Sequence, residues 1–305
     1  MKKVSIFGRS VLSQPEYLKK AENMIISDEE VIWLLAEDLD MGTRERFMRM
    51  PGRHCVKTSE LDHLQADVCE WWRAGGMPIA DRSLVKDAPQ ITEMTYKELR
   101  DLAYMDDDVL PGEAVLILSH LGIPIHIRNI CAPEDAPVVV KASIEGEPEY
   151  TMTGIRGQKN YISVNISRYM LGTEKGYGLR ALEVFDRYHI PYAHVAAGID
   201  THCIFVRRQD FEPQEQRVLA ELYRLPETEN IKIENNLAIL AVIGRHLTSS
   251  RGAVGKLFSA LNQAEIPIKM IDLGFSSQSL LVGVAVDDYE KAIKAIYHLF
   301  VEIHI

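Results

Sequence analysis

Tyr161-Ile-Ser-Val-Asn-Ile166 opens the stretch of sequence that decides the fold, because it begins an order of short elements that occurs twice. Residue type and turn signals predict a strand there, followed by a helix, two strands, a helix and a strand. These five elements are expected over Gly178–Tyr188, Tyr192–Ala197, Cys203–Arg207, Pro213–Leu225 and Ile231–Glu234. The βαββαβ order predicts helices packed on an antiparallel sheet, which is an α+β architecture.

A second round of the same order begins at Leu237–Gly244, so the pattern repeats about every 75 residues. Its remaining elements are expected over Gly252–Ala264, Ile268–Leu273, Ser279–Val286 and Asp287–Val301. This round lacks a fourth strand of its own. We expect Tyr150–Ile155 to take that position; alternatively, the sheet lacks the strand. The predicted domains are residues 158–235 and residues 236–305 together with strand 150–155.

Residues 1–143 predict a separate α/β unit. Its strands are expected over Val4–Phe7, Val31–Ala36 and Ile123–Asn129, and its helices over Ser13–Ile26, Ser59–Trp72, Thr95–Tyr104 and Glu113–Leu121. The prolines and acids of Ala132–Pro137 predict the start of a linker. Residues 37–57 show weak periodicity and receive no assignment.

Composition narrows the class of protein. With 305 residues and 47% apolar side chains, the chain can bury a sizeable core, which excludes a mostly disordered protein. The 44 acidic and 34 basic residues give a net charge of −10, so no nucleic-acid partner is expected. The four cysteines form no CxxC pair and the histidines no ligand spacing, so we expect no metal. No apolar run approaches the roughly 20 residues of a membrane helix, and we expect a cytoplasmic protein without a membrane partner.

The turns that lead into the first helix of each repeat are the candidate binding sites. Free N–H groups at a helix N-terminus suit a carboxylate, and an acidic side chain on a neighbouring turn would suit an ammonium group. In the first repeat these positions are Met170, Gly176, Tyr177, Gly178, Leu179, Gly198, Ile199 and Asp200. Weaker candidates in the second repeat are Ser250, Arg251, Gly252, Ala253, Ser277 and Gln278. Ordinary helix capping explains such residues equally well.

Several motifs resemble the aspartate kinase (aspartokinase) family. Val242-Ile-Gly-Arg-His-Leu-Thr-Ser-Ser-Arg-Gly252 and Asp287–Tyr297 resemble its terminal ACT domain, and His194-Val-Ala-Ala-Gly-Ile-Asp200 resembles its first ACT domain. Upstream, Ala80–Pro89 and Gly122-Ile-Pro-Ile-His-Ile-Arg-Asn129 resemble the end of its kinase domain. The resemblance implies an amino-acid-kinase fold, here truncated, followed by tandem ACT domains. It also implies phosphorylation of L-aspartate by ATP on the route to lysine, threonine and methionine, end-product feedback and a dimer.

The N-terminal strand departs from the family pattern. The family's strand ends in Lys-Phe-Gly-Gly-Ser/Thr-Ser, whose lysine meets the ATP phosphates. The lysine position here is Ile6, or Ser5 if a gap is placed, and Arg9 replaces one glycine. A glycine lets the backbone approach a phosphate closely, whereas the arginine side chain stands in the way.

Two further segments of the kinase half differ from the family. Ala66–Trp72 resembles the strand that leads to the family's Trp-Thr-Asp nucleotide motif, an alternative to the helix expected there, and Arg73 and Ala74 stand where the Thr-Asp would be. Asp106-Asp-Asp-Val-Leu-Pro111 puts acids where a loop would approach the nucleotide. Phosphoryl transfer depends on positioning and on stabilising charge. We therefore predict no catalytic residue, no cofactor and no aspartate kinase activity.

The function expected from these features is an amino-acid-sensing regulatory protein. It would bind an amino-acid effector through its ACT domains, form a homodimer through them and act on a partner, for which a full-length aspartate kinase is the candidate. The alternative is an active aspartate kinase with a reduced catalytic domain, which would use ATP and magnesium. A third interpretation is a structural subunit whose ACT pair only dimerises.

Overall fold

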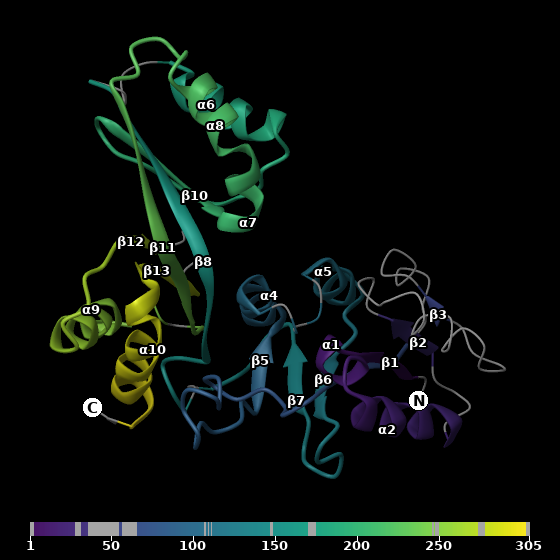
Figure 1. Ribbon diagram of the computed structural model, residues 1–305. Coiled ribbons are helices and arrows are strands. Elements are labelled where there is room, and N and C mark those ends of the chain that lie inside the picture. The colour runs from purple at the N-terminus through teal and green to yellow at the C-terminus, as the bar shows by residue number, and fades with distance from the viewer. Residues whose placement is uncertain are drawn as a thin grey trace.

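The computed structural model describes residues 3–27, 32–35, 55–56, 66–106, 108, 110, 112–146, 149–169, 175–245, 247, 250–273 and 278–302. Within these ranges the first half of the chain forms a seven-stranded sheet and the second half a six-stranded sheet. Figure 1 shows the two long strands of the second sheet rising away from the first unit. Of the unassigned segment 37–57, only the short strand β3 (Cys55–Val56) lies within the described residues.

The first sheet has the strand order β3-β2-β1-β4-β6-β7-β5. Neighbours are parallel from β3 to β6, β7 runs antiparallel to β6, and β5 is parallel to β7. The bounds are β1 (Lys3–Phe7), β2 (Ile32–Leu35), β4 (Val68–Arg73), β5 (Glu93–Thr95), β6 (Ile125–Asn129) and β7 (Val138–Lys141). The predicted α/β class of this unit is confirmed, as are its three predicted strands to within about two residues.

The predicted helix over Ser59–Trp72 is wrong from residue 66 onward, because Val68–Arg73 form the central strand β4, and the alternative strand that the family resemblance implies is confirmed. Residues 59–65 of that prediction lie outside the described residues. Trp71 belongs to one buried cluster and Trp72 to another, as expected for successive residues of a strand that point to opposite faces. Both faces of β4 are covered, so its sequence shows no polar alternation. The apolar spacing that predicts a helix here therefore reflects a strand buried on both sides.

The remaining predicted helices of this unit are confirmed. They are α2 (Pro15–Ser27), α4 (Tyr96–Met105) and α5 (Gly112–Leu121). The short helix α1 (Arg9–Leu12), which precedes α2, was not predicted. Helix α4 begins with a capping box, in which the Glu98 backbone donates to the Thr95 hydroxyl and the Thr95 backbone donates to the Glu98 carboxylate. Such a cap fixes the start of the helix and the position of its buried face.

The predicted linker at Ala132–Pro137 is wrong. These residues form the turn between β6 and β7, which pair antiparallel within the same sheet. The prolines and acids mark a tight connection on the surface, and the chain leaves the first unit only after β7.

The second sheet has the order β12-β13-β11-β8-β10-β9, with every neighbouring pair antiparallel. Its bounds are β8 (Gly154–Ser167), β9 (Tyr192–Ala197), β10 (Thr201–Arg207), β11 (Asn230–Ile243), β12 (Met270–Leu273) and β13 (Ser279–Ala285). Residues 231–234 and 237–243, predicted as two strands, form one strand whose register shifts between Glu234 and Leu237. Asn236 has φ 58° there, and Asn160 has φ 69° in β8.

The fourth strand of the second repeat comes from the start of β8. Gly154 and Ile155 pair with Ile243 and Val242, at the position predicted for Tyr150–Ile155. Residues 149–153 lie outside any strand. Reciprocally, the first half of β11 pairs with the second half of β8 and completes the first repeat. The two repeats therefore exchange strands, and the alternative of a missing strand is wrong.

Helices flank the second sheet at both ends, as Figure 1 shows. Beside the upper end lie α6 (Tyr177–Arg187), α7 (Arg208–Phe211), η3 (Glu212–Gln214) and α8 (Glu215–Leu222). Beside the lower end lie α9 (Ala253–Gln263), η4 (Val286–Asp288), α10 (Tyr289–Tyr297) and η5 (His298–Glu302). The upper helices share a core with β8 and β10. Among the described residues, no helix is long and apolar enough to cross a membrane.

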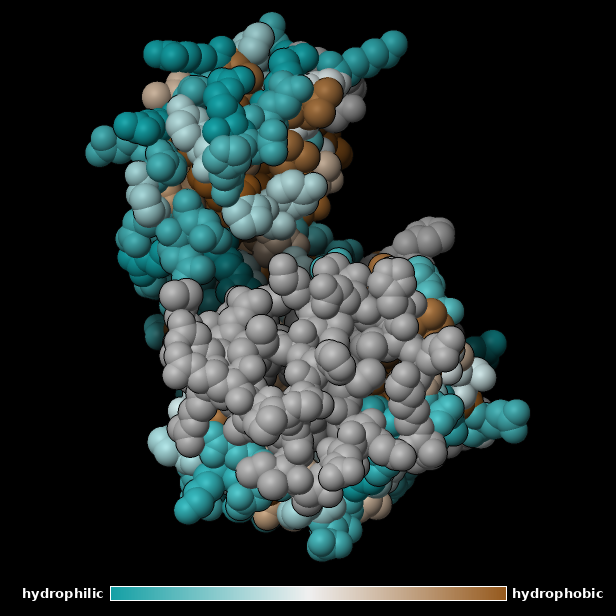
Figure 2. Space-filling view, turned by 90° about the vertical axis from the view of Figure 1, so that its right-hand side faces the viewer, coloured by the Kyte–Doolittle hydropathy of each residue, from teal (hydrophilic) through white to brown (hydrophobic). Residues whose placement is uncertain are grey.

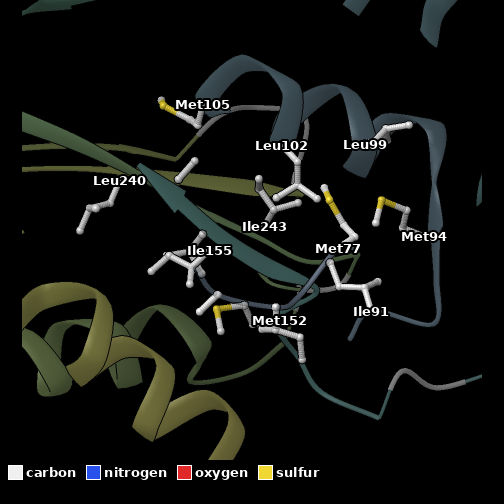
Figure 3. Packing of buried hydrophobic residues seen from close by; sticks show 14 of the residues in the cluster. Met77, Ile91, Met94, Leu99, Leu102, Met105, Met152, Ile155, Leu240 and Ile243 are labelled. Carbon is white, nitrogen blue, oxygen red and sulfur yellow. The ribbon is translucent and has the colours of Figure 1, made fainter. Parts of the chain in front are cut away.

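One buried cluster joins the two units. It contains residues of α4, the lower half of β11 and the start of β8, and Figure 3 shows Leu102 pointing toward Ile243. Gly154 lies so close to α4 that an added Cβ would be 3.2 Å from Leu102 Cδ2. The kinase-like sheet and the second sheet are therefore packed together through α4.

Candidate functional site

The N-terminus of α6 is built around a buried tyrosine. Gly176 caps the helix with φ 81°, in the left-handed region that glycine tolerates. The Tyr177 hydroxyl shares a 2.6 Å hydrogen bond with the Thr228 hydroxyl. The guanidinium carbons of Arg168 and Arg180 lie 5.1 and 5.8 Å from the Tyr177 ring centroid. This arrangement places two arginines at the helix start, where a carboxylate is favoured, and one of them, Arg168, already forms an ion pair with Glu227.

His202 packs against the same helix start. Its ring lies edge-on to Tyr177 at a centroid distance of 6.3 Å. A Cβ on Gly178 would be 2.6 Å from His202 Cε1, so this position leaves no room for a side chain. Burial lowers the pKa of His202, which favours the neutral imidazole.

The predicted acidic turn lies at the same end of the sheet. The Gly198 N–H donates to the Thr201 carbonyl at 2.7 Å, and the Arg168 N–H donates to the Asp200 carbonyl at 3.0 Å. Arg168 thus links the tyrosine at the start of α6 to the Asp200 turn. Leu179 and Ile199 are largely exposed, and Met170 lies outside the described residues. Arg168 and His202 are site residues that sequence reasoning missed.

In the second repeat, the weaker candidates are only partly brought together. Gly252 caps α9 with φ 85°, and the Ser250 carbonyl accepts the Ala253 N–H at 3.3 Å. Ala253 is buried and Arg251 is exposed. Gln278 instead accepts the Gly244 N–H through its backbone carbonyl, and Ser277 lies outside the described residues.

The start of α1 carries an unexpected acidic contact. The Ser10 N–H donates to Asp108 Oδ1 at 2.7 Å, and the Ala74 N–H donates to Ser10 Oγ at 3.1 Å. Ser5 and Ile6, the positions of the family lysine, are both buried, and neither side chain carries a charge. A carboxylate of the protein therefore occupies a backbone donor in the turn that resembles the family's phosphate-binding segment.

Two arginines continue this network toward the second sheet. Arg73 Nη2 lies 3.3 Å from Asp108 Oδ2 and 3.6 Å from Asp106 Oδ2. Arg156 on β8 lies 3.3 Å from Asp106 Oδ2 and donates to the carbonyls of Pro78, Ile79 and Ile155. Burial lowers the pKa of Arg156, and the nearby Asp106 opposes that shift. Sequence reasoning located Arg73 and the acids but missed Arg156, because nothing in β8 signals its partner Asp106 at the end of α4.

A cavity of about 400 Å³ lies beside this network, between the two units. Arg73, Arg82 and Arg156 line it together with Asp81, Asp106 and Tyr289. No group of three or more His, Cys, Asp or Glu side chains with metal-binding geometry occurs within the described ranges. The positive charge that Arg73 and Arg156 bring to the cavity is therefore already shared with carboxylates.

An α/β sheet of the amino-acid-kinase type joined to a strand-exchanged α+β sheet defines a class of regulated kinase-like proteins. A sequence model described as ACT domain matches residues 240–300. Aspartokinase 3 of Bacillus subtilis is 30% identical over 241 residues, covering 78% of this chain and 52% of that protein. The bifunctional aspartokinase/homoserine dehydrogenase of Haemophilus influenzae is 25% identical, covering 76% of this chain and 29% of that protein.

Solved structures agree with the sequence comparisons on the fold. Clostridium acetobutylicum aspartate kinase superposes with a TM-score of 0.77 at 20% identity, covering 98% of this chain and 99% of that one. E. coli aspartokinase III in complex with aspartate and ADP gives a TM-score of 0.77 at 14% identity, with the same coverage of both chains. The chain belongs to the aspartokinase family, with an ACT domain at its C-terminal end. It spans about half of the Bacillus relative and less of the bifunctional one.

Proposed function

We propose that this chain is a regulatory aspartokinase homologue that binds a free amino acid through its ACT units and does not phosphorylate aspartate. The observation that carries the second part is the contact between Asp108 and the Ser10 N–H. It supports the proposal because a carboxylate takes a backbone donor in the segment that resembles the family's phosphate-binding turn.

The charges around this contact disfavour a nucleotide. A triphosphate brings several negative charges and needs free cations and N–H donors. Here Asp106 and Asp108 both lie within 3.6 Å of Arg73, and Ile6 or Ser5 replaces the family lysine. Loss of one charge-stabilising contact costs about 3 kcal/mol in such sites, which is roughly a hundredfold in rate.

A coupled assay of the purified full chain tests the absence of kinase activity. We expect no turnover that depends on both ATP and L-aspartate, and no saturable rise in melting temperature with Mg-ATP. A full-length aspartokinase assayed in parallel is the positive control. Turnover near the rate of that control would overturn the proposal.

A second candidate function is aspartate kinase activity from a reduced catalytic unit. The cavity of about 400 Å³ and its three arginines favour it, because guanidinium groups bind phosphate well. ATP and magnesium would then be required. The same assay decides between the two candidates.

The α6 site supports amino-acid binding. A carboxylate at the start of α6 and an ammonium group near Asp200 would place both charged ends of an amino acid against complementary groups. A solved structure of E. coli aspartokinase III is a complex with lysine and aspartate. We propose an amino-acid effector for this chain as well, with lysine and threonine as the first ligands to test.

Calorimetry with the twenty protein L-amino acids tests this site. We expect at least one to bind saturably and Asp200→Asn to abolish that binding. Asp186→Asn, which makes the same change at an exposed position near the end of α6, is the matched control and should bind normally. Silence for all twenty amino acids would contradict the sensing function.

Association through the ACT units is the last part of the proposal. Tyr169, Leu179, Ile199 and Tyr223 are more than half exposed on the first repeat. Figure 2 shows hydrophobic patches among hydrophilic residues on the upper unit. We propose that this unit forms a homodimer and that a full-length aspartate kinase is its partner. Sedimentation of the chain alone, and then with that kinase, tests both statements.

A further inference from the structure

A second cavity lies where the kinase-like unit meets the end of β11. It has a volume of about 230 Å³ and draws its walls from four places in the chain, one of which is Ile79. Residues 90–93 come from the segment before and within β5, residues 149–153 from the approach to β8, and Arg245 from the loop after β11. Figure 3 shows Ile91 and Met152 near Ile243, at the border of the cluster that joins the units.

Arg245 is the cationic group among the described residues that line this cavity. Its side chain is 10% exposed, and its Nε lies 3.5 Å from Glu98 Oε1. The Glu98 carboxylate already accepts three hydrogen bonds, from the Thr95 N–H at 2.7 Å, the Thr95 hydroxyl at 2.8 Å and the Thr153 hydroxyl at 2.5 Å. Within the part of the chain that the structure describes, Nε of Arg245 is buried without a hydrogen-bond acceptor. The ion pair with Glu98 therefore leaves this nitrogen without a well-formed hydrogen bond, which costs free energy. The same guanidinium lines the cavity, where its planar group can meet a carboxylate.

The other groups that line the cavity select the kind of anion. Glu93 and Glu149 contribute carboxylates, and Glu93 lies 3.3 Å from Lys141. Ile79, Ile91 and Met152 contribute apolar surface. Two carboxylates would repel a phosphate, whereas a molecule with one carboxylate and one ammonium group complements both signs of charge.

We propose that this cavity binds a free α-amino acid with a small or apolar side chain, with its carboxylate on Arg245 and its ammonium group toward Glu149. Such a ligand would touch the kinase-like unit, the segment between the units and the loop after β11 at once. It would therefore hold α4, which carries Glu98, against the end of β11. The site is separate from the α6 site and requires neither effector binding near Asp200 nor kinase activity.

The test uses calorimetry of the full chain with each of the twenty protein L-amino acids, and with propionate and ethylammonium as single-charge fragments. Arg245→Lys keeps a positive charge beside Glu98 but loses the planar fork that binds a carboxylate. Thr92→Trp places an aromatic ring at an exposed position on the cavity wall and leaves the Glu98 contacts in place. Melting temperatures of both variants verify that they fold.

We expect an amino acid of small or apolar side chain to bind at least tenfold more weakly to Arg245→Lys and to Thr92→Trp. Asp200→Asn should leave this binding unchanged, and either fragment alone should bind more weakly than the amino acid. The proposal is overturned if no such amino acid binds, if both folded variants bind as tightly as the unaltered chain, or if Asp200→Asn alone removes the binding. The last result would place all amino-acid binding at the α6 site and would leave the proposed effector function intact.

Discussion

Position 178 requires glycine because of a neighbouring side chain rather than because of its backbone conformation. Because His202 fills the space above it, a methyl group there would meet the imidazole at 2.6 Å. Gly178→Ala is therefore expected to lower the free energy of unfolding by about 1–3 kcal/mol, since overpacking forces the ring to move. Urea unfolding measures this change.

Gly255 provides the control for this substitution. It lies inside α9, and nothing lies within 4 Å of an added Cβ. Gly255→Ala should raise the free energy of unfolding by about 0.5–1 kcal/mol, because alanine favours helix more than glycine does. Equal effects of the two substitutions would show that His202 does not restrict Gly178.

Acidification is expected to destabilise the chain through two partly buried histidines. Burial lowers the pKa of His202, and burial together with the Arg128 cation lowers the pKa of His126. The unfolded chain takes up protons near the ordinary pKa of about 6.5, and the folded chain does so only at lower pH. The stabilisation is therefore complete above about pH 6.5 and falls as the pH decreases through and below that value.

Urea unfolding at several pH values between about 7.5 and 5 measures this loss. His202→Asn and His126→Asn should each flatten the decline, because each removes one group that the folded state keeps neutral. A decline of unchanged steepness in both variants would contradict the assignment.

At the scale of single residues, sequence reasoning predicted only part of the candidate site. Glycines and small polar residues before a helix identified the α6 turn, because their backbone role is local. Arg168 directly follows β8, His202 lies on β10, and Asp108 meets Ser10 across almost a hundred residues of chain. Such contacts depend on strand order and register, which one sequence without relatives does not define.

At the scale of elements, the long strands β8 and β11 each pass a residue with positive φ, Asn160 and Asn236. Asparagine tolerates this conformation better than other residues with a side chain. Asn236→Ala should lower the free energy of unfolding by about 1 kcal/mol, and Asn236→Gly should lower it less. Chemical denaturation of the two variants checks the order; an alanine variant as stable as the glycine variant would contradict it.

Most elements were predictable because their patterns are local. The capping box of Thr95 and Glu98 and the apolar face of α4 are examples. The wrong helix over Ser59–Trp72 arose because β4 is covered on both faces and shows no alternation. The fusion of two predicted strands into β11 was missed, because one prediction ends at Glu234 and the next begins at Leu237, where the chain only shifts register.

At the scale of the whole molecule, α4 connects the two sheets. Leu102 is fully buried in the cluster that they share. Leu102→Ala is expected to lower the free energy of unfolding by about 2–5 kcal/mol, through lost apolar contact and the cavity left behind. Leu116→Ala on α5, where the side chain is 45% exposed, is the control and should cost much less.

Hydrogen exchange of β11 measures whether this loss spreads between units. We expect Leu102→Ala to speed exchange in both β11 and α4, because both depend on the same cluster. Faster exchange confined to α4 would show that the two sheets are stabilised separately.

The exchange of half-strands between β8 and β11 has a consequence for inheritance. The outermost half-strand of each repeat comes from the other repeat, so neither repeat has a complete sheet on its own. A protein fragment that contained one repeat alone would have a row of backbone amide groups without hydrogen-bond partners. An inherited deletion of one repeat is therefore expected to destabilise the other as well.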